Sequence, residues 1–215
     1  SVRVVEATVI GGGFSRRMWR ARLATDGDEQ RVIVRIEQGG MFGTDTATEV
    51  NAMRALHRAG FALPAVLDVE PTGSVLGEPC FVMEQVPGVA RVDDEGLADI
   101  IRSVAALHAM PASVLDDSGR SPEQVIADVI EYWRTMYRAH LPEHPLIEHS
   151  AAWLHENLRP TGPTVIVHGD AGPGNALFDV ERGLTTIDWE LAHVGDAAED
   201  WAYLALIRGR RIMNA

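Results

Sequence analysis

The chain has 215 residues, of which 46% are apolar, so it is long enough to build one sizeable core or two small lobes. Its formal net charge of −12 disfavours nucleic acid and anionic membrane surfaces as partners, and no window approaches the ~18 consecutive apolar residues of a spanning helix. The only cysteine, Cys80, cannot form an internal disulfide and is expected to be a buried apolar side chain, which fits a cytoplasmic protein.

The first part of the chain is predicted to form a small antiparallel sheet with one helix. Alternating patterns and short apolar runs predict strands over residues 2–10, 18–24, 31–37, 64–70 and 80–86. A helix is predicted over residues 46–59, where Thr46 and Glu49 fit a capping box and Gly60 ends the helix. The first two strands are joined by Gly11, Gly12, Gly13, Phe14 and Ser15.

The rest of the chain is predicted to be mainly helical. Apolar residues at helical spacing predict helices over residues 93–109, 121–137, 146–158 and 196–207. The pair Pro87-Gly88 after the fifth strand marks the best lobe boundary. We therefore predict an α+β fold with two lobes, residues 1–87 and 88–215, and expect the second lobe to be incomplete at its C-terminal end.

The most informative stretch lies just before the last predicted helix. A short buried strand ends in the turn His168-Gly169-Asp170, and Asn175 completes a D-x-x-x-x-N spacing. Another acid, Asp188, follows a further short strand. Phosphoryl transfer needs such a set, because one carboxylate accepts a hydroxyl proton while an amide and a second carboxylate hold Mg²⁺ on the nucleotide phosphates.

Asp170 is therefore the candidate general base, and Asn175 and Asp188 are the candidate metal ligands. Taken singly, the three residues are also typical of turns and strand ends, and only their common order favours the site. Glu190 either contacts a second metal ion or is solvated, and both alternatives stay open.

Three further polar residues near this stretch are predicted to be structural. His168 is expected to orient the loop through hydrogen bonds to the backbone rather than to act as a base. Asp196 is expected to cap the last helix, and Asp200 to be a buried acid that fixes the loop.

A second group of candidate residues lies in the first lobe. The glycine-rich segment either closes over triphosphate oxygens or is an ordinary hairpin turn. Arg35 on the third strand is suited to pair with phosphates and with Glu49, unless Glu49 is held by its capping box. The chain contains no lysine that could replace this arginine. Alternation along the strand puts Arg35 opposite the more apolar face, which leaves open whether its own face is a cleft or open solvent.

At these motifs the chain resembles the aminoglycoside phosphotransferase and choline kinase-like group, which are relatives of the protein kinases. The resemblance runs in order along nearly the whole chain. It includes the glycine segment, Glu49, and residues 32–35 (VIVR), 81–88 (FVMEQVPG), 168–175 (HGDAGPGN), 187–190 (IDWE) and 195–202 (GDAAEDWA). Residues 189–196 (WELAHVGD) look closest to the branch that includes kinase-like domains fused to some acyl-CoA dehydrogenases.

The resemblance implies a bilobal protein-kinase-like fold with ATP, or alternatively GTP, between the lobes and Mg²⁺ as the metal. It implies that the backbone of Met83, Glu84 and Val86 reads the adenine, and that the phosphoryl acceptor is a small hydroxylated molecule. The chain departs from the family in two respects. Arg35 replaces the usual phosphate-pairing lysine, and the helices that usually follow the last motif are short or absent.

Two functions are compatible with these observations. The first is a small-molecule kinase that transfers the γ-phosphoryl group of ATP to a hydroxyl group. The second is a nucleotide-binding pseudokinase or regulatory module, which the Arg35 replacement leaves open. A metal-dependent hydrolase is disfavoured, because D-x-x-x-x-N and one further acid do not supply several convergent metal ligands.

Overall fold

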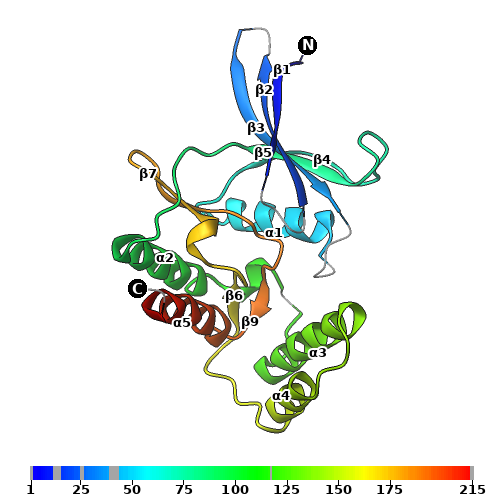
Figure 1. The fold of residues 1–215 in the computed structure, drawn as a ribbon, viewed down its shortest axis with the longest axis vertical. Helices are drawn as coiled ribbons and strands as arrows, with labels where there is room; N and C mark the ends of the chain where they lie inside the picture. Colours follow the sequence, from blue (N-terminus) through cyan, green and yellow to red (C-terminus); the bar gives the residue numbers. More distant parts are fainter. Residues whose placement is uncertain (1, 12–15, 25–26, 39–43, 117, 214–215) are drawn as a thin grey trace. The chain divides into compact units, whose positions relative to one another are not determined.

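A computed structural model describes residues 2–11, 16–24, 27–38, 44–116 and 118–213 of the chain (Figure 1). The chain divides into two compact units. Unit 1 consists of Ser1–Arg91 and Ala176–Glu190, and unit 2 consists of Val92–Asn175 and Leu191–Ala215. Unit 1 therefore combines the first part of the chain with a short segment from the second.

Unit 1 is built on a five-stranded antiparallel sheet with the strand order β1-β2-β3-β5-β4 (Figure 1). The strands are β1 (Arg3–Ile10), β2 (Arg16–Ala24), β3 (Glu29–Glu37), β4 (Val66–Glu70) and β5 (Cys80–Glu84). All five predicted strands are present. On the face of β3 opposite to Arg35, the side chains of Val32 and Ile36 are buried, as the apolar alternation predicts.

The single helix of unit 1, α1 (Thr46–Arg58), packs against β4 and β5. Its N-cap is Asp45, whose Oδ1 accepts a hydrogen bond from the Thr48 N–H at 2.6 Å. The predicted capping box of Thr46 and Glu49 is therefore wrong, because Asp45 takes the capping position and leaves the Glu49 side chain available elsewhere. The predicted end at Gly60 is confirmed, since Ala59 is the C-cap and Gly60, the next residue, has a φ of +86°.

A hairpin from the second part of the chain completes unit 1. Its strands, β7 (Ala176–Asp179) and β8 (Gly183–Thr186), pair with each other. The Val89 N–H donates to the Phe178 carbonyl at 3.0 Å, and the Phe178 N–H donates back at 2.9 Å. Unit 1 thus includes residues 88–91 and 176–190, which lie outside the predicted first lobe.

Unit 2 contains the four predicted helices of the second part of the chain. They are α2 (Asp94–His108), α3 (Pro122–His140), α4 (Pro145–Glu156) and α5 (Ala198–Met213). Two short strands, β6 (Val165–Val167) and β9 (His193–Gly195), form an antiparallel pair, and two 3₁₀ turns lie at Ala112–Val114 and Pro173–Asn175. The core is formed by the apolar stripe of α2 and by β6, whose three residues are all buried.

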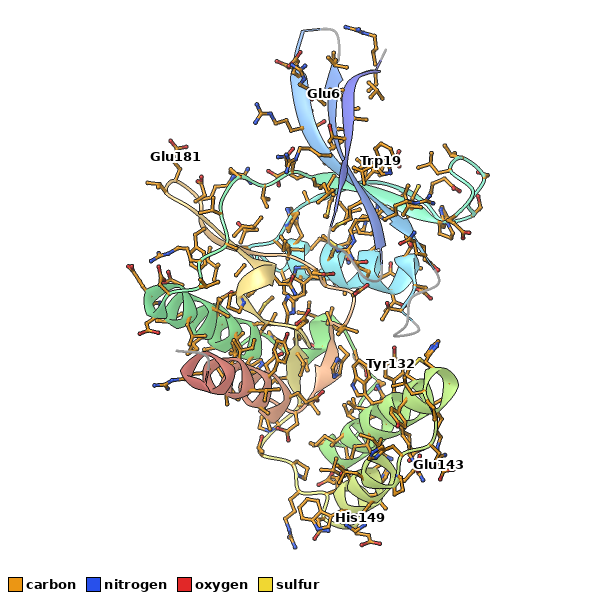
Figure 2. The ribbon with its side chains drawn as sticks, in the orientation of Figure 1. Glu6, Trp19, Tyr132, Glu143, His149 and Glu181 are labelled. Carbon is orange, nitrogen blue, oxygen red and sulfur yellow. The ribbon has the colours of Figure 1, made fainter. Side chains whose placement is uncertain are left out.

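Helices α3 and α4 form a hairpin with a largely exposed outer surface. Ser121 and Gln124 form a capping box at the start of α3, which confirms the predicted helix start. Figure 2 labels Tyr132 on α3, Glu143 in the connection and His149 on α4, and all three are exposed. Within the described ranges, no helix is both long and apolar enough to cross a membrane.

Candidate active site

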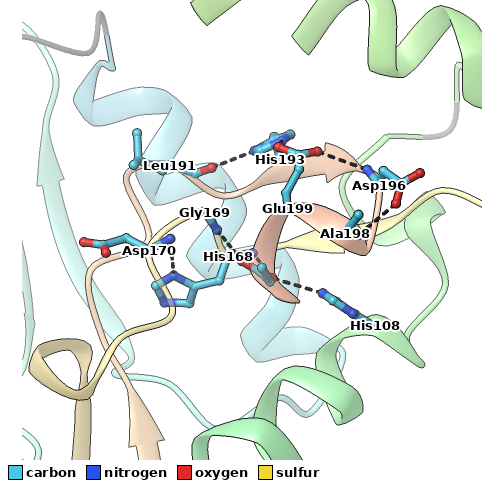
Figure 3. A network of polar contacts seen from close by, with 10 residues as sticks. His108, His168, Gly169, Asp170, Leu191, His193, Asp196, Ala198 and Glu199 are labelled. Atoms are coloured by element: carbon cyan, nitrogen blue, oxygen red, sulfur yellow. Dashed lines mark hydrogen bonds and ion pairs between the residues drawn. The ribbon is translucent and has the colours of Figure 1, made fainter. Parts of the chain in front are cut away.

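The loop that carries Asp170 is anchored by the buried carboxylate of Asp200. Asp200, on α5, is fully buried, and its carboxylate accepts hydrogen bonds from the backbone N–H groups of His168 and Gly169, both at 3.0 Å (Figure 3). The ring of His108, in the last turn of α2, lies 3.0 Å from the same carboxylate. This confirms the prediction that Asp200 is a buried acid that fixes the loop.

The hydrogen bonds around Asp200 determine its charge state. Burial by itself would raise the pKa of Asp200, but the hydrogen bonds from His108, His168 and Gly169 favour the carboxylate and lower its pKa below the ordinary value. His168 is 1% exposed, and its Nδ1 accepts a hydrogen bond from the Asp170 N–H at 3.3 Å. The His168 ring therefore orients the loop, as predicted. The contact of His108 could not be predicted, because 92 residues separate it from Asp200.

Asp170 and Asn175 are in direct contact within unit 2. The Asn175 amide nitrogen donates to the Asp170 side-chain Oδ2 at 2.8 Å and to the Asp170 carbonyl at 3.0 Å. Because both donors of the amide are directed at acceptors, the orientation of the Asn175 side chain is determined, and its amide oxygen is left to accept or to ligate. The D-x-x-x-x-N spacing thus places an oriented carboxylate next to an oxygen donor that suits Mg²⁺.

Gly169 is needed for the tight turn that presents Asp170. Its φ is +82°, and a Cβ atom there would lie 2.8 Å from the Leu191 Cβ and 2.9 Å from the Leu191 carbonyl oxygen. Replacing Gly169 with alanine is expected to lower the free energy of unfolding by about 2–4 kcal/mol, through left-handed strain and overpacking. Urea unfolding measures this loss.

Gly174 provides the matched control for this substitution. It lies in the same motif, and a Cβ atom on Gly174 would meet nothing within 4 Å. Gly174→Ala is therefore expected to change the free energy of unfolding by no more than about 0.5–1 kcal/mol. Equal losses for the two variants would mean that the Leu191 contact does not constrain the turn.

A histidine that sequence reasoning did not single out connects β9 to α5. His193 Nδ1 lies 2.8 Å from the Leu191 carbonyl, and its Nε2 lies 3.1 Å from Glu199 Oε2 (Figure 3). Both neighbours are acceptors, so the ring satisfies both only when it carries both protons. Burial works against the charged ring, but the hydrogen bond and charge of Glu199 outweigh it, and the pKa of His193 is raised above its ordinary value.

This arrangement predicts a pH dependence of stability. A raised pKa in the folded state means that the His193 contribution is complete below the unfolded-state pKa of about 6.5 and is lost as the pH rises through the folded-state pKa. The free energy of unfolding of the wild type should therefore fall above about pH 6.5 relative to that of His193→Gln. His149→Gln, at an exposed position on α4, is the control and should retain the wild-type pH profile.

Asp196, the second of these acids, stabilises the start of α5 through hydrogen bonds. Asp196 accepts hydrogen bonds from the Ala198 N–H and the Thr161 N–H, both at 2.8 Å. Burial acts to raise the pKa of Asp196, but the hydrogen bonds from the Thr161 hydroxyl, the Thr161 N–H and the Ala198 N–H lower it overall. The prediction that Asp196 caps the last helix is confirmed, although the helix itself begins at Ala198.

In unit 1, Arg35 lies among three acidic side chains. Both of its Nη atoms donate to Asp188 Oδ1 at 3.0 Å, and its Nη1 lies 3.1 Å from Glu49 Oε1. Glu190 Oε2 is farther away, at 3.8 Å. The Arg35 side chain is only 4% exposed, so its face of β3 is not open solvent at this position. The predicted pairing of Arg35 with Glu49 is confirmed, and Glu190 approaches the same guanidinium.

The acidic neighbours of Arg35 keep its guanidinium group protonated. Burial disfavours the guanidinium, but Glu49, Asp188 and Glu190 together raise the pKa of Arg35 above its ordinary value. The guanidinium also lies 5.9 Å from the centre of the Phe81 ring, its partner residue on β5. Sequence alternation predicted the face of β3, but the partner Asp188 lies 153 residues away and carried no local signal.

Asp188 is held in an unusual backbone conformation. Its φ of 66° is the only positive value at a non-glycine residue in the described part of the chain. Such a conformation persists where the surroundings hold the residue, and aspartate tolerates it better than most residues. The next residue, Trp189, is 1% exposed, donates from Nε1 to the Thr186 carbonyl at 3.1 Å and packs edge-on against Phe61. Trp189 therefore anchors the loop that presents Asp188.

The predicted adenine-reading segment extends β5. The Glu84 N–H donates to the Ala65 carbonyl at 2.9 Å, and the Gln85 N–H donates to the Arg31 carbonyl at 3.2 Å. No hydrogen bond to the Val86 N–H is found among the described residues. Met83 lies on β5 opposite Ile33 and is buried. The other predicted nucleotide contacts, Gly12, Gly13, Phe14 and Ser15, lie outside the described residues.

The structure thus brings the candidate residues together in two sets. Arg35, Glu49 and Asp188 are in contact in unit 1, and Asp170 and Asn175 are in contact in unit 2. Their oxygen donors fit Mg²⁺ in kind, since this ion prefers few protein ligands and completes its shell with phosphate and water. In the described residues, no three acidic, histidine or cysteine side chains converge to hold a metal ion by themselves.

Comparison with known proteins agrees with this arrangement. The family model described as "Phosphotransferase enzyme family" matches residues 6–213. Acyl-CoA dehydrogenase family member 10 of Mus musculus is 31% identical over 212 residues, which cover 90% of this chain and 20% of that protein. The chain therefore spans about a fifth of the length of this relative. The predicted resemblance to this family and branch is confirmed.

Solved structures show the same fold. An ethanolamine kinase of Plasmodium vivax superimposes with a TM-score of 0.70 at 14% identity, over 93% of this chain and 61% of that chain. The choline kinase LicA of Streptococcus pneumoniae gives a TM-score of 0.66 at 17% identity, over 95% of this chain and 70% of that chain. The predicted α+β, protein-kinase-like fold is confirmed.

Proposed function

The chain belongs to the phosphotransferase enzyme family, and from this premise we propose that it transfers the γ-phosphoryl group of ATP to a hydroxyl group of a small molecule. GTP is the alternative donor. We further propose that the two predicted lobes, residues 1–87 and 88–215, act as a nucleotide-binding lobe and a catalytic lobe.

Unit 1 would bind the nucleotide. Arg35 would pair with the phosphates, and Glu49 would hold the guanidinium in place for them. The glycine-rich segment with Gly12, Gly13, Phe14 and Ser15 would cover the phosphates. The backbone of Met83, Glu84 and Val86 would bind the adenine. The Val86 N–H lies just beyond the end of β5 and would donate to the base.

Unit 2 would supply the base for the acceptor. Asp170 would orient the hydroxyl group and accept its proton while the bond to phosphorus forms. Asn175 would hold the Asp170 carboxylate and direct its amide oxygen at the metal ion, with Asp188 as the other protein ligand. Mg²⁺, when bound, would neutralise the phosphate charge.

The observation that carries this proposal is the buried Arg35 between Glu49 and Asp188. Removing an arginine and two acidic partners from water costs free energy that their attraction only partly offsets. This cluster is therefore not explained by a contribution to the stability of the fold. Its position makes sense when a polyanionic ligand shares the guanidinium. The retained Asp170–Asn175 contact favours a kinase over a pseudokinase, because a nucleotide-binding module has no need of an oriented base.

The proposal is tested by nucleotide binding followed by turnover. ATP and GTP are titrated with and without Mg²⁺, and ATP consumption is then measured over a panel of hydroxylated metabolites that includes choline, ethanolamine, sugars, macrolides and aminoglycosides. The expected result is Mg²⁺-dependent binding and consumption with at least one acceptor. Binding without turnover on any acceptor would favour the regulatory module, and absence of nucleotide binding would contradict both.

A further inference from the structure

Arg35 has one fully buried and one half-buried acidic partner in unit 1. The Glu49 side chain is 0% exposed, so no ligand can reach it without unfolding the contact. The Asp188 side chain is 32% exposed, yet it receives both hydrogen bonds from the Arg35 fork. The half-buried Asp188 therefore accepts both hydrogen bonds of the fork, while the fully buried Glu49 lies 3.1 Å from Arg35 Nη1 and is closed to solvent.

The same Asp188 carboxylate is the proposed metal ligand. A carboxylate that accepts two charge-assisted hydrogen bonds is a weaker ligand, and an adjacent guanidinium repels a divalent cation. In unit 1, Arg35 therefore places a positive charge at the same carboxylate that a metal ion would use. The Arg35–Asp188 contact and full metal ligation by Asp188 compete with each other.

We propose that Arg35 is an internal counter-ion of Asp188 that changes partner when a nucleotide binds. The phosphates take the guanidinium fork, and this exchange releases Asp188 for the metal ion. Glu49 keeps Arg35 charged and in place throughout the exchange. This inference rests on the proposed function, and it adds that nucleotide and metal are coupled through one arginine, so that metal alone binds poorly.

Arginine suits this role better than lysine would. Its planar fork presents several donors in fixed directions, so Glu49 and a second anion can be contacted at the same time. Asp188, whose φ is 66°, is followed by the buried Trp189, which anchors the backbone of the loop. The exchange therefore requires a side-chain movement of Arg35 and leaves the Trp189 anchor of the loop unchanged.

The first test measures ADP binding without metal, in EDTA, for wild type and Asp188→Asn. Asparagine tolerates the left-handed backbone of this position but holds Arg35 less strongly, because its acceptor is neutral. Asp188→Asn should therefore bind ADP more tightly than wild type, by on the order of tenfold, while losing the added affinity from Mg²⁺. Adenosine, which has no phosphates, should bind both proteins equally.

Glu190→Gln is the matched control for the loss of a negative charge near Arg35. It removes one negative charge at 3.8 Å from Arg35 without removing a hydrogen bond from Arg35. The exchange predicts a clearly smaller gain in ADP affinity for Glu190→Gln than for Asp188→Asn. Equal gains, or no gain for Asp188→Asn, would overturn the inference.

The second test measures metal binding without nucleotide, with Mn²⁺ as the probe and electron paramagnetic resonance as the readout. Arg35→Gln alone would leave Glu49 buried without its cation, so the double variant Arg35→Gln/Glu49→Gln is used. It should bind Mn²⁺ about tenfold more tightly than wild type, and the further change Asp188→Asn should abolish this gain. Equal Mn²⁺ binding by wild type and the double variant would overturn the inference.

The two tests separate this inference from the proposed function. If ADP binds to no variant under any condition, the proposed function fails, and the Mn²⁺ comparison alone decides whether Arg35 blocks Asp188. If ADP binds normally but neither affinity changes as stated, the nucleotide site stands and the exchange is rejected.

Discussion

Replacing Asp170 with asparagine is expected to lower kcat by about two to four orders of magnitude while leaving ATP affinity nearly unchanged. A general base acts on the proton of the acceptor in the transition state, so its loss affects the chemical step. Asparagine can still accept the hydrogen bond from Asn175, so the loop should keep its geometry. Steady-state kinetics with the identified acceptor and isothermal titration with ATP measure the two effects.

The control for this prediction is Glu143→Gln, an exposed acid outside both residue sets (Figure 2). Its kcat and ATP affinity should equal those of the wild type. If Asp170→Asn retained near wild-type kcat, Asp170 would not be the base. If it lost kcat and ATP affinity in the same proportion, the substitution would have disturbed the whole protein rather than the proton transfer.

The Asp200→Ala variant is expected to lose about 3–5 kcal/mol of unfolding free energy, the second large effect. The loss arises because the His168 and Gly169 N–H groups would keep their buried positions without an acceptor. The His108 ring would lose its partner as well. Urea unfolding measures the loss, and Asp128→Ala, whose side chain is 65% exposed, is the control and should change stability by no more than about 1 kcal/mol.

The pH dependence of the Asp200→Ala effect follows from the lowered pKa. A carboxyl group with a lowered folded-state pKa contributes stability above its unfolded-state pKa of about 4 and loses that contribution as the pH falls through the folded-state value. The stability difference between wild type and Asp200→Ala should therefore be complete above about pH 4 and shrink in more acidic solution. A constant difference down to the acid limit would mean that the charge of Asp200 does not contribute to its role.

Local patterns determined which segments form helices and strands. The alternation in β3, the capping box at Ser121 and the glycine after α1 act through neighbours within a few residues, so the sequence alone predicted them. The D-x-x-x-x-N spacing also operates within one loop, and it placed Asn175 against Asp170 as expected. The role of Asp200 was predicted from its motif, although its hydrogen bonds reach the N–H groups of His168 and Gly169, 32 and 31 residues away.

Only the tertiary structure determined which side chains far apart in the sequence form ion pairs and hydrogen bonds. From the sequence, Glu49 could either pair with Arg35 or take part in a capping box with Thr46. The structure excludes the capping box, because Asp45 occupies the N-cap. The grip of Arg35 on Asp188, the contact of His108 with Asp200 and the incorporation of the β7–β8 hairpin into unit 1 join residues far apart in the chain. Such pairings depend on how packed elements approach each other, and a single sequence contains no periodicity that encodes this approach.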